Sequence, residues 1–189
     1  MITLLFSGGI DSMTLAHEAL ASNQLATLLF FRYGQPSESN EAHAVAEWRR
    51  RHAPQIRLID VTLSIGAAPM TLGSGVPGPR VLPGRNLLML SHGIAAAAQS
   101  GHRAVWYGAQ GGDAADYPDC RPPFVAAVNA LAQQWGVSVE APLLHLNKAQ
   151  VIERAVRAGV DLRSAWSCYE PYNGKPCGTC NACAARRIG

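Results

Sequence analysis

The stretch that decides the fold is LLFSGGIDSMTLA, residues 4–16. An apolar run typical of a buried strand ends at Ser-Gly-Gly, and a segment with helical character follows. A glycine-rich turn between a strand and a helix lets backbone N–H groups approach phosphate oxygens, and the helix adds its positive end. The stretch therefore predicts a phosphate-binding loop at the carboxyl end of the first strand.

The side chains of this loop refine the prediction. Ser7 and Ser12 supply hydroxyl donors, whereas Asp11 is negatively charged and is expected either to cap the helix or to hold Mg²⁺. No Gly-Lys-Ser/Thr follows, so this is not a Walker motif, and it is not GxGxxG either. Ser-Gly-Gly-x-Asp-Ser resembles the PP-loop of ATP pyrophosphatases, which implies that an oxygen attacks the α-phosphorus of ATP and pyrophosphate leaves.

Composition sets limits on the class of protein. The 189 residues suit one domain, 1–189, and 48% hydrophobic content allows a sizeable core. A net charge of +3 does not argue for nucleic-acid binding. We find no signal peptide and no apolar stretch of the ~18 residues that a membrane span needs, so we expect a cytoplasmic protein with reduced thiols.

Apolar and helical segments alternate along the chain. This pattern predicts an α/β fold, a Rossmann-like parallel sheet with helices on both faces. We expect strands at 2–6, 25–31, 56–61, 103–109 and 137–140, and helices at 11–21, 41–52 with Asn40 as cap, 85–100, 122–135 and 147–158. Residues 64–84, rich in glycine and proline, are either a flexible surface loop or a mobile flap over a site.

The tail, residues 168–187, carries the spacing C-x8-C-x2-C-x2-C. Four thiolates in a reduced compartment suit a closed structural Zn²⁺ site, and an iron–sulfur cluster is the main alternative. The predicted ligands are Cys168, Cys177, Cys180 and Cys183. Arg186 and Arg187 follow the last ligand, and we expect them to be solvated charges.

Further motifs extend the resemblance to one family. They are YGQ at 33–35, PGRN at 83–86, DxxxYPDCRP at 113–122, a PL…K segment at 142–148, and WSCY…CGTCNAC in the tail. Together with FSGGIDS, they resemble the 7-cyano-7-deazaguanine synthase (QueC-type) family over nearly the whole chain. The resemblance implies that ATP, Mg²⁺ and ammonia convert 7-carboxy-7-deazaguanine first to the amide and then to the nitrile.

The resemblance also implies residue roles, position by position. ATP phosphates would be held by Phe6, Ser7, Gly8, Gly9, Asp11 and Ser12. Arg85 and Lys148 would act on the α-phosphate or the leaving pyrophosphate, although Arg85 could instead clamp the substrate carboxylate. With Asp113 they form the predicted catalytic set. Substrate contacts are expected from Tyr33, Gln35, Asn86, Tyr117, Asp119 and Arg121. The resemblance further suggests a homodimer, with the alanine-rich helix 85–100 either packing closely against the partner or forming ordinary core.

Cys120 is left outside these roles. It is either a nucleophile or, as we favour, a small buried packing residue, because no base stands near it in sequence.

The chain departs from the family pattern at its acceptor side. Arg32 stands where an acid is usual, Pro36-Ser37 replaces an Arg-His pair, and Ala114-Ala115-Asp116 replaces a stretch with an aromatic residue. These departures suggest a relative that stops at the amide or uses another amine, for example on a protein and in anti-phage defence. Two further hypotheses are a non-catalytic nucleotide sensor and a tRNA thiolation enzyme that uses its cysteines.

Overall fold

The computed structural model describes residues 1–64 and 82–188. Five parallel strands form one sheet in the order β3-β2-β1-β4-β5. The strands are β1 (Ile2–Leu5), β2 (Leu25–Arg32), β3 (Arg57–Thr62), β4 (Ala104–Trp106) and β5 (Ser138–Glu140). The predicted parallel α/β architecture is therefore confirmed, and the strand order reverses beside β1, where such sheets bind ligands.

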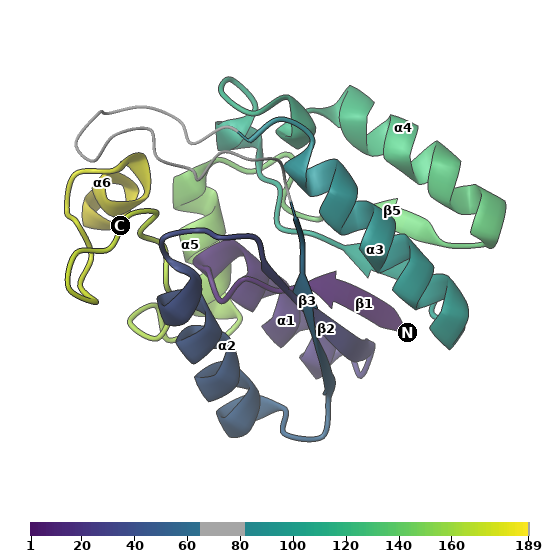
Figure 1. The fold of residues 1–189 in the computed structure, drawn as a ribbon, viewed down its shortest axis with the longest axis horizontal. Coiled ribbons are helices and arrows are strands. Elements are labelled where there is room, and N and C mark those ends of the chain that lie inside the picture. The colour runs from purple at the N-terminus through teal and green to yellow at the C-terminus, as the bar shows by residue number, and fades with distance from the viewer. Residues whose placement is uncertain (65–81, 189) are drawn as a thin grey trace.

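Helices cover both faces of the sheet, as Figure 1 shows. The helices are α1 (Ile10–Ala21), α2 (Glu38–His52), α3 (Arg85–Ser100), α4 (Pro122–Ala132), α5 (Lys148–Arg157) and α6 (Asn181–Ile188). Helices α3 and α4 lie together on one side, and α1, α2 and α5 lie on the other. None of the helices within the described ranges is long and apolar enough to cross a membrane.

Four details differ from the sequence prediction. Helix α2 begins at Glu38 after Ser37, so Asn40 is not its cap; instead, the Asn40 side-chain amide donates to the carbonyl of Gly174 in the tail, at 3.2 Å. Strand β4 ends at Trp106, and α4 gives way to a 3₁₀ turn at Gln133–Trp135. Helix α6 was not predicted. The predicted flap falls mainly on residues 65–81, which lie outside the described residues.

The core forms where the apolar strands meet the apolar faces of the helices. Phe6, Leu4 and Leu28 are fully buried in the layer that β1 and β2 share with α1. On the other face, α3 approaches the sheet closely at Gly93, where an added Cβ would lie 2.9 Å from Val105 Cγ1. This side of the alanine-rich helix, on which Ala97 is fully buried, therefore packs against the sheet as part of the core.

Gly93 supplies a test of this packing. Gly93→Val places carbon atoms where Val105 and Leu5 already lie, so we expect the free energy of unfolding to fall by about 1–3 kcal/mol. Urea unfolding measures it. Ala95→Val, on the exposed side of the same helix, is the control for the helix propensity of valine. Equal losses in the two variants would contradict close packing at Gly93.

Candidate active site

A cavity of about 260 Å³ opens at the carboxyl ends of β1, β2 and β4. Its walls come from the turn after β1, the turn after β2, the start of α3, the segment after β4, and one tail residue, Tyr169. Most of the predicted site residues line it: Phe6, Ser7, Gly9, Asp11, Ser12, Tyr33, Gln35, Arg85, Asn86, Asp113, Tyr117 and Asp119. The fold thus gathers motifs that are far apart in sequence into one space.

The turn after β1 has the geometry of a phosphate loop. Gly8 has φ +76°, and an added Cβ would lie 3.0 Å from Ala44 Cβ in α2, so only glycine fits there. Gly9 is the N-cap of α1 and has no side chain to occupy the helix end. Ser12 Oγ donates to the Gly9 carbonyl at 3.0 Å and lies 3.4 Å from Ser7 Oγ. Hydroxyls and the positive helix end therefore face the cavity together.

Asp11 lies inside the first turn of α1, so it is not the helix cap. Its carboxylate accepts a hydrogen bond from Lys148 Nζ at 2.7 Å. Lys148 is the first residue of α5, whose N-terminus is fixed by a capping box between Asn147 and Gln150. Asp11 thereby holds the Lys148 ammonium group in position beside the phosphate loop.

Arg85 enters the cavity from the start of α3. Its guanidinium is mostly buried, lies 5.8 Å from the centre of the Tyr33 ring, and donates to the Tyr33 hydroxyl at 3.4 Å and to Asn86 Oδ1 at 3.3 Å. Within the described ranges, no carboxylate lies in salt-bridge contact with it. Asp119 and Glu41 act on this guanidinium electrostatically without such a contact, so its donors face the cavity and can bind an anionic ligand.

Glu41, in α2, was not predicted as a site residue. Its carboxylate lines the cavity, accepts from Ser37 Oγ at 2.6 Å and from Gln35 Nε2 at 3.0 Å, and has its pKa raised by burial. The sequence pattern explained Glu41 only as an acid in the first turn of a helix. Its contacts with Gln35 and Ser37, in the turn after β2, could be seen only in the tertiary structure.

Gln35 lies in the predicted place, but its polar atoms are engaged within the protein. Its Oε1 accepts from the backbone N–H of Tyr33 at 2.9 Å, and its Nε2 also donates to the Phe31 carbonyl at 2.9 Å. Gln35 therefore braces the turn after β2 and holds Glu41 at the wall of the cavity.

The segment after β4 forms the opposite wall. Burial raises the pKa of Asp113, and the nearby Asp11 adds to the effect. Cys120 is buried at the wall, and burial raises the pKa of its thiol to about 12, so the thiol is protonated at neutral pH. A protonated thiol favours the packing role for Cys120 over the nucleophilic one.

Arg121, predicted to line the pocket, lies instead on the outside of that wall. Its guanidinium donates to the carbonyls of Ala114 at 2.8 Å and Ala115 at 3.2 Å. It therefore supports the fold of this segment.

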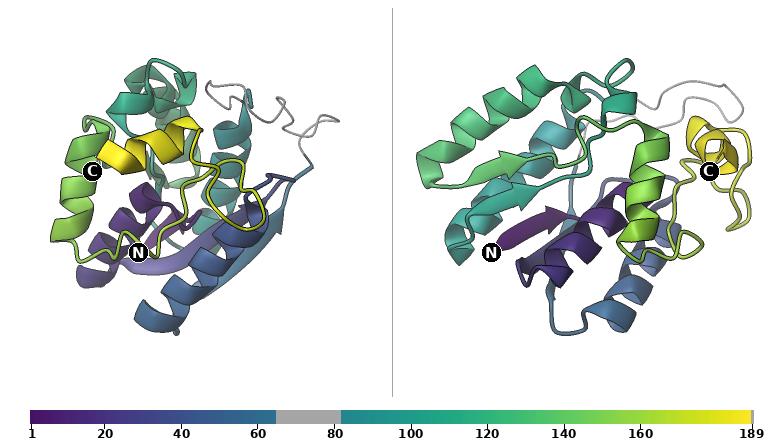
Figure 2. Two further views of the ribbon diagram at one scale, coloured as in Figure 1. Left: turned by 90° about the vertical axis from the view of Figure 1, so that its left-hand side faces the viewer. Right: turned by 180° about the vertical axis from the view of Figure 1, so that it is seen from behind.

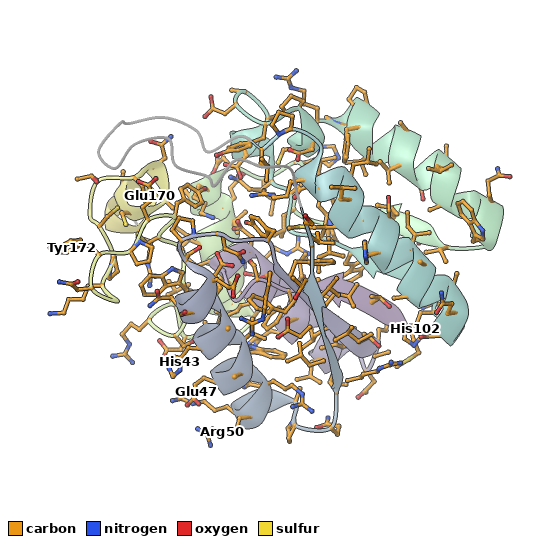
Figure 3. All side chains as sticks on the ribbon, in the orientation of Figure 1. His43, Glu47, Arg50, His102, Glu170 and Tyr172 are labelled. Carbon is orange, nitrogen blue, oxygen red and sulfur yellow. The ribbon has the colours of Figure 1, made fainter. Side chains whose placement is uncertain are left out.

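The four tail cysteines converge as predicted. Their sulfur atoms all lie within 4.8 Å of one another. Backbone N–H groups point at two of them, from Cys177 to Cys168 Sγ at 3.2 Å and from Cys180 to Cys177 Sγ at 3.4 Å. Four sulfur donors with supporting N–H groups fit a metal ion or cluster. Figure 3 shows Tyr172 on the outer side of the loop that links the first two ligands, where its side chain is exposed.

Comparison with known proteins extends over the whole chain. The family model described as "Queuosine biosynthesis protein QueC" matches residues 1–189. A 7-cyano-7-deazaguanine synthase from Marinobacter nauticus is 34% identical, covering 98% of this chain and 90% of the relative. The enzyme of that name from Syntrophotalea carbinolica is 36% identical, with the same coverage of 98% and 90%.

Solved structures agree on the fold. The NMN synthetase of Francisella tularensis aligns with a TM-score of 0.59 at 16% identity, covering 94% of this chain and 70% of that one. The U34-tRNA thiolase NcsA of Methanococcus maripaludis, solved with its [4Fe-4S] cluster, aligns with a TM-score of 0.61 at 12% identity. This chain is covered to 99% and spans 64% of the thiolase's length. Likeness at such low identity shows the fold alone.

Metal content tests the cysteine cluster. Cys180→Ser removes one of four ligands, so we expect the purified protein to lose most of its metal, as measured by plasma mass spectrometry. Cys120→Ser changes the one cysteine outside the cluster and should keep the wild-type metal content. Loss of metal in both variants, or in neither, would contradict the assignment.

The raised pKa of Glu41 predicts a pH effect on stability. Its carboxylate takes up a proton more readily in the folded state than in the unfolded state. As the pH falls from 8, the free energy of unfolding of the wild type should therefore rise relative to that of Glu41→Gln, because the folded wild type takes up the proton first. Urea unfolding of both proteins between pH 8 and pH 5 measures this. Glu153→Gln, at an exposed carboxylate, should show no such trend, and a constant difference for Glu41→Gln would refute the prediction.

Proposed function

The chain belongs to the QueC family, and from this we propose that it is a 7-cyano-7-deazaguanine synthase. Such an enzyme is an ATP-dependent C–N ligase that acts on 7-carboxy-7-deazaguanine and ammonia. The observation that carries the proposal is the shared cavity: the phosphate loop and the buried Arg85 guanidinium face the same space. A nucleotide and an anionic substrate can therefore meet there.

The chemistry requires two activations. A carboxylate oxygen of the substrate attacks the α-phosphorus of ATP, and the bond to pyrophosphate breaks. Ammonia adds to the acyl carbon, loses a proton, and expels AMP to leave the amide. The amide oxygen then attacks the α-phosphorus of a second ATP and expels pyrophosphate, and loss of AMP and protons from the adenylylated amide gives the nitrile. Positioning and stabilisation of charge at phosphorus supply most of the catalysis.

Residue roles follow from the arrangement of the cavity. The Gly9 N–H and the hydroxyls of Ser7 and Ser12 bind phosphate oxygens at the start of α1. Arg85 holds the substrate carboxylate, because its fork of donors matches two carboxylate oxygens. Lys148, held beside the loop by Asp11, neutralises charge on the pyrophosphate as it leaves.

Mg²⁺ would enter with ATP. Burial and then the charge of Asp11 raise the pKa of Asp113, so the two carboxylates act on each other. Lys148 contacts Oδ1 of Asp11, and carboxylate oxygens of this pair would be the ligands for the ion beside the phosphate loop. The ion would neutralise charge on the polyphosphate.

The base of the substrate needs hydrogen-bond acceptors. The N1–H and 2-amino groups of a deazaguanine are donors, and the carboxylates of Glu41 and Asp119 line the cavity. Tyr117 at the same wall offers a ring for stacking. Glu41 is held in place by Ser37 and Gln35, so its carboxylate is ready to accept.

Further proposals concern the metal, the assembly and the location. Four cysteines leave no open coordination position, so the tail binds a structural Zn²⁺, with iron as the alternative that would favour a thiolase. The homodimer and the cytoplasmic location stay predictions. For the dimer, the exposed side of α3 carries Leu87 and Leu88.

Most of the sequence departures lie outside the cavity and give no support to another reaction. Arg32 forms ion pairs with Asp60 at 2.8 Å and Glu38 at 3.0 Å, and neither it nor residues 114–116 line the cavity in the part of the chain described. Ser37, which stands in place of a basic residue, does line the cavity, where its hydroxyl donates to Glu41.

The test is product analysis by mass spectrometry. The protein is incubated with 7-carboxy-7-deazaguanine, ATP, Mg²⁺ and ammonia, and we expect the nitrile. Arg85→Met should lower kcat/KM by about 10²–10³-fold, because it removes a buried charged partner. Ser7→Ala should lower it by about 10-fold or more. Arg57→Met and Ser22→Ala are exposed controls and should retain activity.

Other outcomes of this experiment point elsewhere. The amide alone would mean that the second activation does not occur. AMP and pyrophosphate without either product would indicate a different amine acceptor. Absence of ATP cleavage would overturn the proposal in favour of a nucleotide sensor.

A further inference from the structure

The tail touches the phosphate loop directly. The backbone N–H of Trp166 donates to the carbonyl oxygen of Gly8 at 2.9 Å. An added Cβ at Gly9 would lie 3.4 Å from the carbonyl oxygen of Trp166, so the two segments are in close contact. Residues near the two ends of the chain therefore meet at the loop predicted to bind ATP.

This contact sets the orientation of one peptide group. A trans peptide is planar, so the Gly8 carbonyl and the Gly9 N–H point in opposite directions. Because Trp166 holds the carbonyl, the Gly9 N–H must face the other way. It points to Ser7 Oγ, at 3.4 Å, on the side where Gly9 and Ser7 line the cavity. Trp166 thus fixes the direction of a donor that faces the phosphate.

Arg186, from α6, holds the segment that leads into Trp166. Its Nη1 donates to the Ala165 carbonyl at 2.7 Å, and its Nη2 donates to the Leu162 carbonyl at 2.6 Å. The sequence-based expectation of a solvated charge was therefore wrong for Arg186. Two parallel carbonyl contacts use the fork of a guanidinium, which a single ammonium cannot match.

The other end of the segment is tied to the cysteine cluster. The indole Nε1 of Trp166 donates to the carbonyl of Cys168 at 2.9 Å, and Cys168 is one of the four ligands. Arg186 also follows the last ligand, Cys183, in the same helix. Residues 162–168, which we call the strap, are thus fixed on both sides of Trp166.

We infer that Arg186 is a positioning residue for the phosphate loop and acts through Trp166. It holds the strap, the strap holds the Gly8 carbonyl, and the Gly9 N–H is thereby directed at the phosphates of the nucleotide. This rests on the proposed function only in taking ATP as the ligand. The tail then serves the reaction centre in addition to its own fold.

Calorimetry of ligand binding, without the deazapurine, tests the inference. Arg186→Met should raise the Kd for Mg-ATP about fivefold to tenfold and leave the Kd for adenosine, which lacks phosphates, within twofold. Arg186→Lys keeps the charge and loses the fork, so its ATP Kd should fall between those of wild type and Arg186→Met. Arg163→Met, at an exposed arginine in the strap, is the matched control and should bind ATP as wild type does.

Several results would overturn the inference. They are an unchanged ATP Kd in Arg186→Met, an equal loss for ATP and adenosine, or an equal effect of Arg163→Met. Metal content is measured alongside: an Arg186→Met protein that loses its metal and binds both ligands equally poorly would show that Arg186 serves only the fold of the tail. Failure of the wild type itself to bind ATP would instead refute the proposed function.

Discussion

The site depends on the absence of a side chain at Gly8. Its left-handed conformation turns the chain from β1 into α1 within a few residues, and α2 packs so closely that a Cβ would meet Ala44 and the Glu41 carbonyl. That close approach has a second result, because the same helix brings the Glu41 side chain to the cavity. The contact between Gly8 and α2 therefore positions both the phosphate loop and one wall of the cavity.

The features that could be predicted from the sequence are those that depend on the pattern of neighbouring residues. Alternating apolar and helical segments gave the parallel α/β fold, and the glycines and hydroxyls at 7–12 indicated a phosphate loop. Contacts between distant segments were not predictable in this way. Glu41 is typical of a first helical turn, and only the turn after β2 makes it a cavity residue. Arg186 is typical of a solvated terminus, and only the fold brings two carbonyls to it. Arg121 is the opposite case, because it belongs to a motif but binds backbone carbonyls and does not line the cavity.

Two charged side chains in the cavity are held by hydrogen bonds from its walls. Arg85 and Glu41 are both mostly buried and each is held by neutral groups, Arg85 by Tyr33 and Asn86, and Glu41 by Ser37. Burying a charge costs free energy unless a ligand compensates. Binding of a ligand that compensates these charges is therefore expected to stabilise the protein.

The link between Trp166 and Gly8 also bears on how the protein is made. The loop lies at residues 7–12, whereas Trp166, which contacts it, lies far along the chain and is therefore made much later. Contacts that span the whole sequence form late, because the intervening chain must first be ordered. A nascent chain would hold the β1 strand and its loop before Trp166 exists, so the loop would acquire its final shape, and with it its nucleotide affinity, only after the strap has been made.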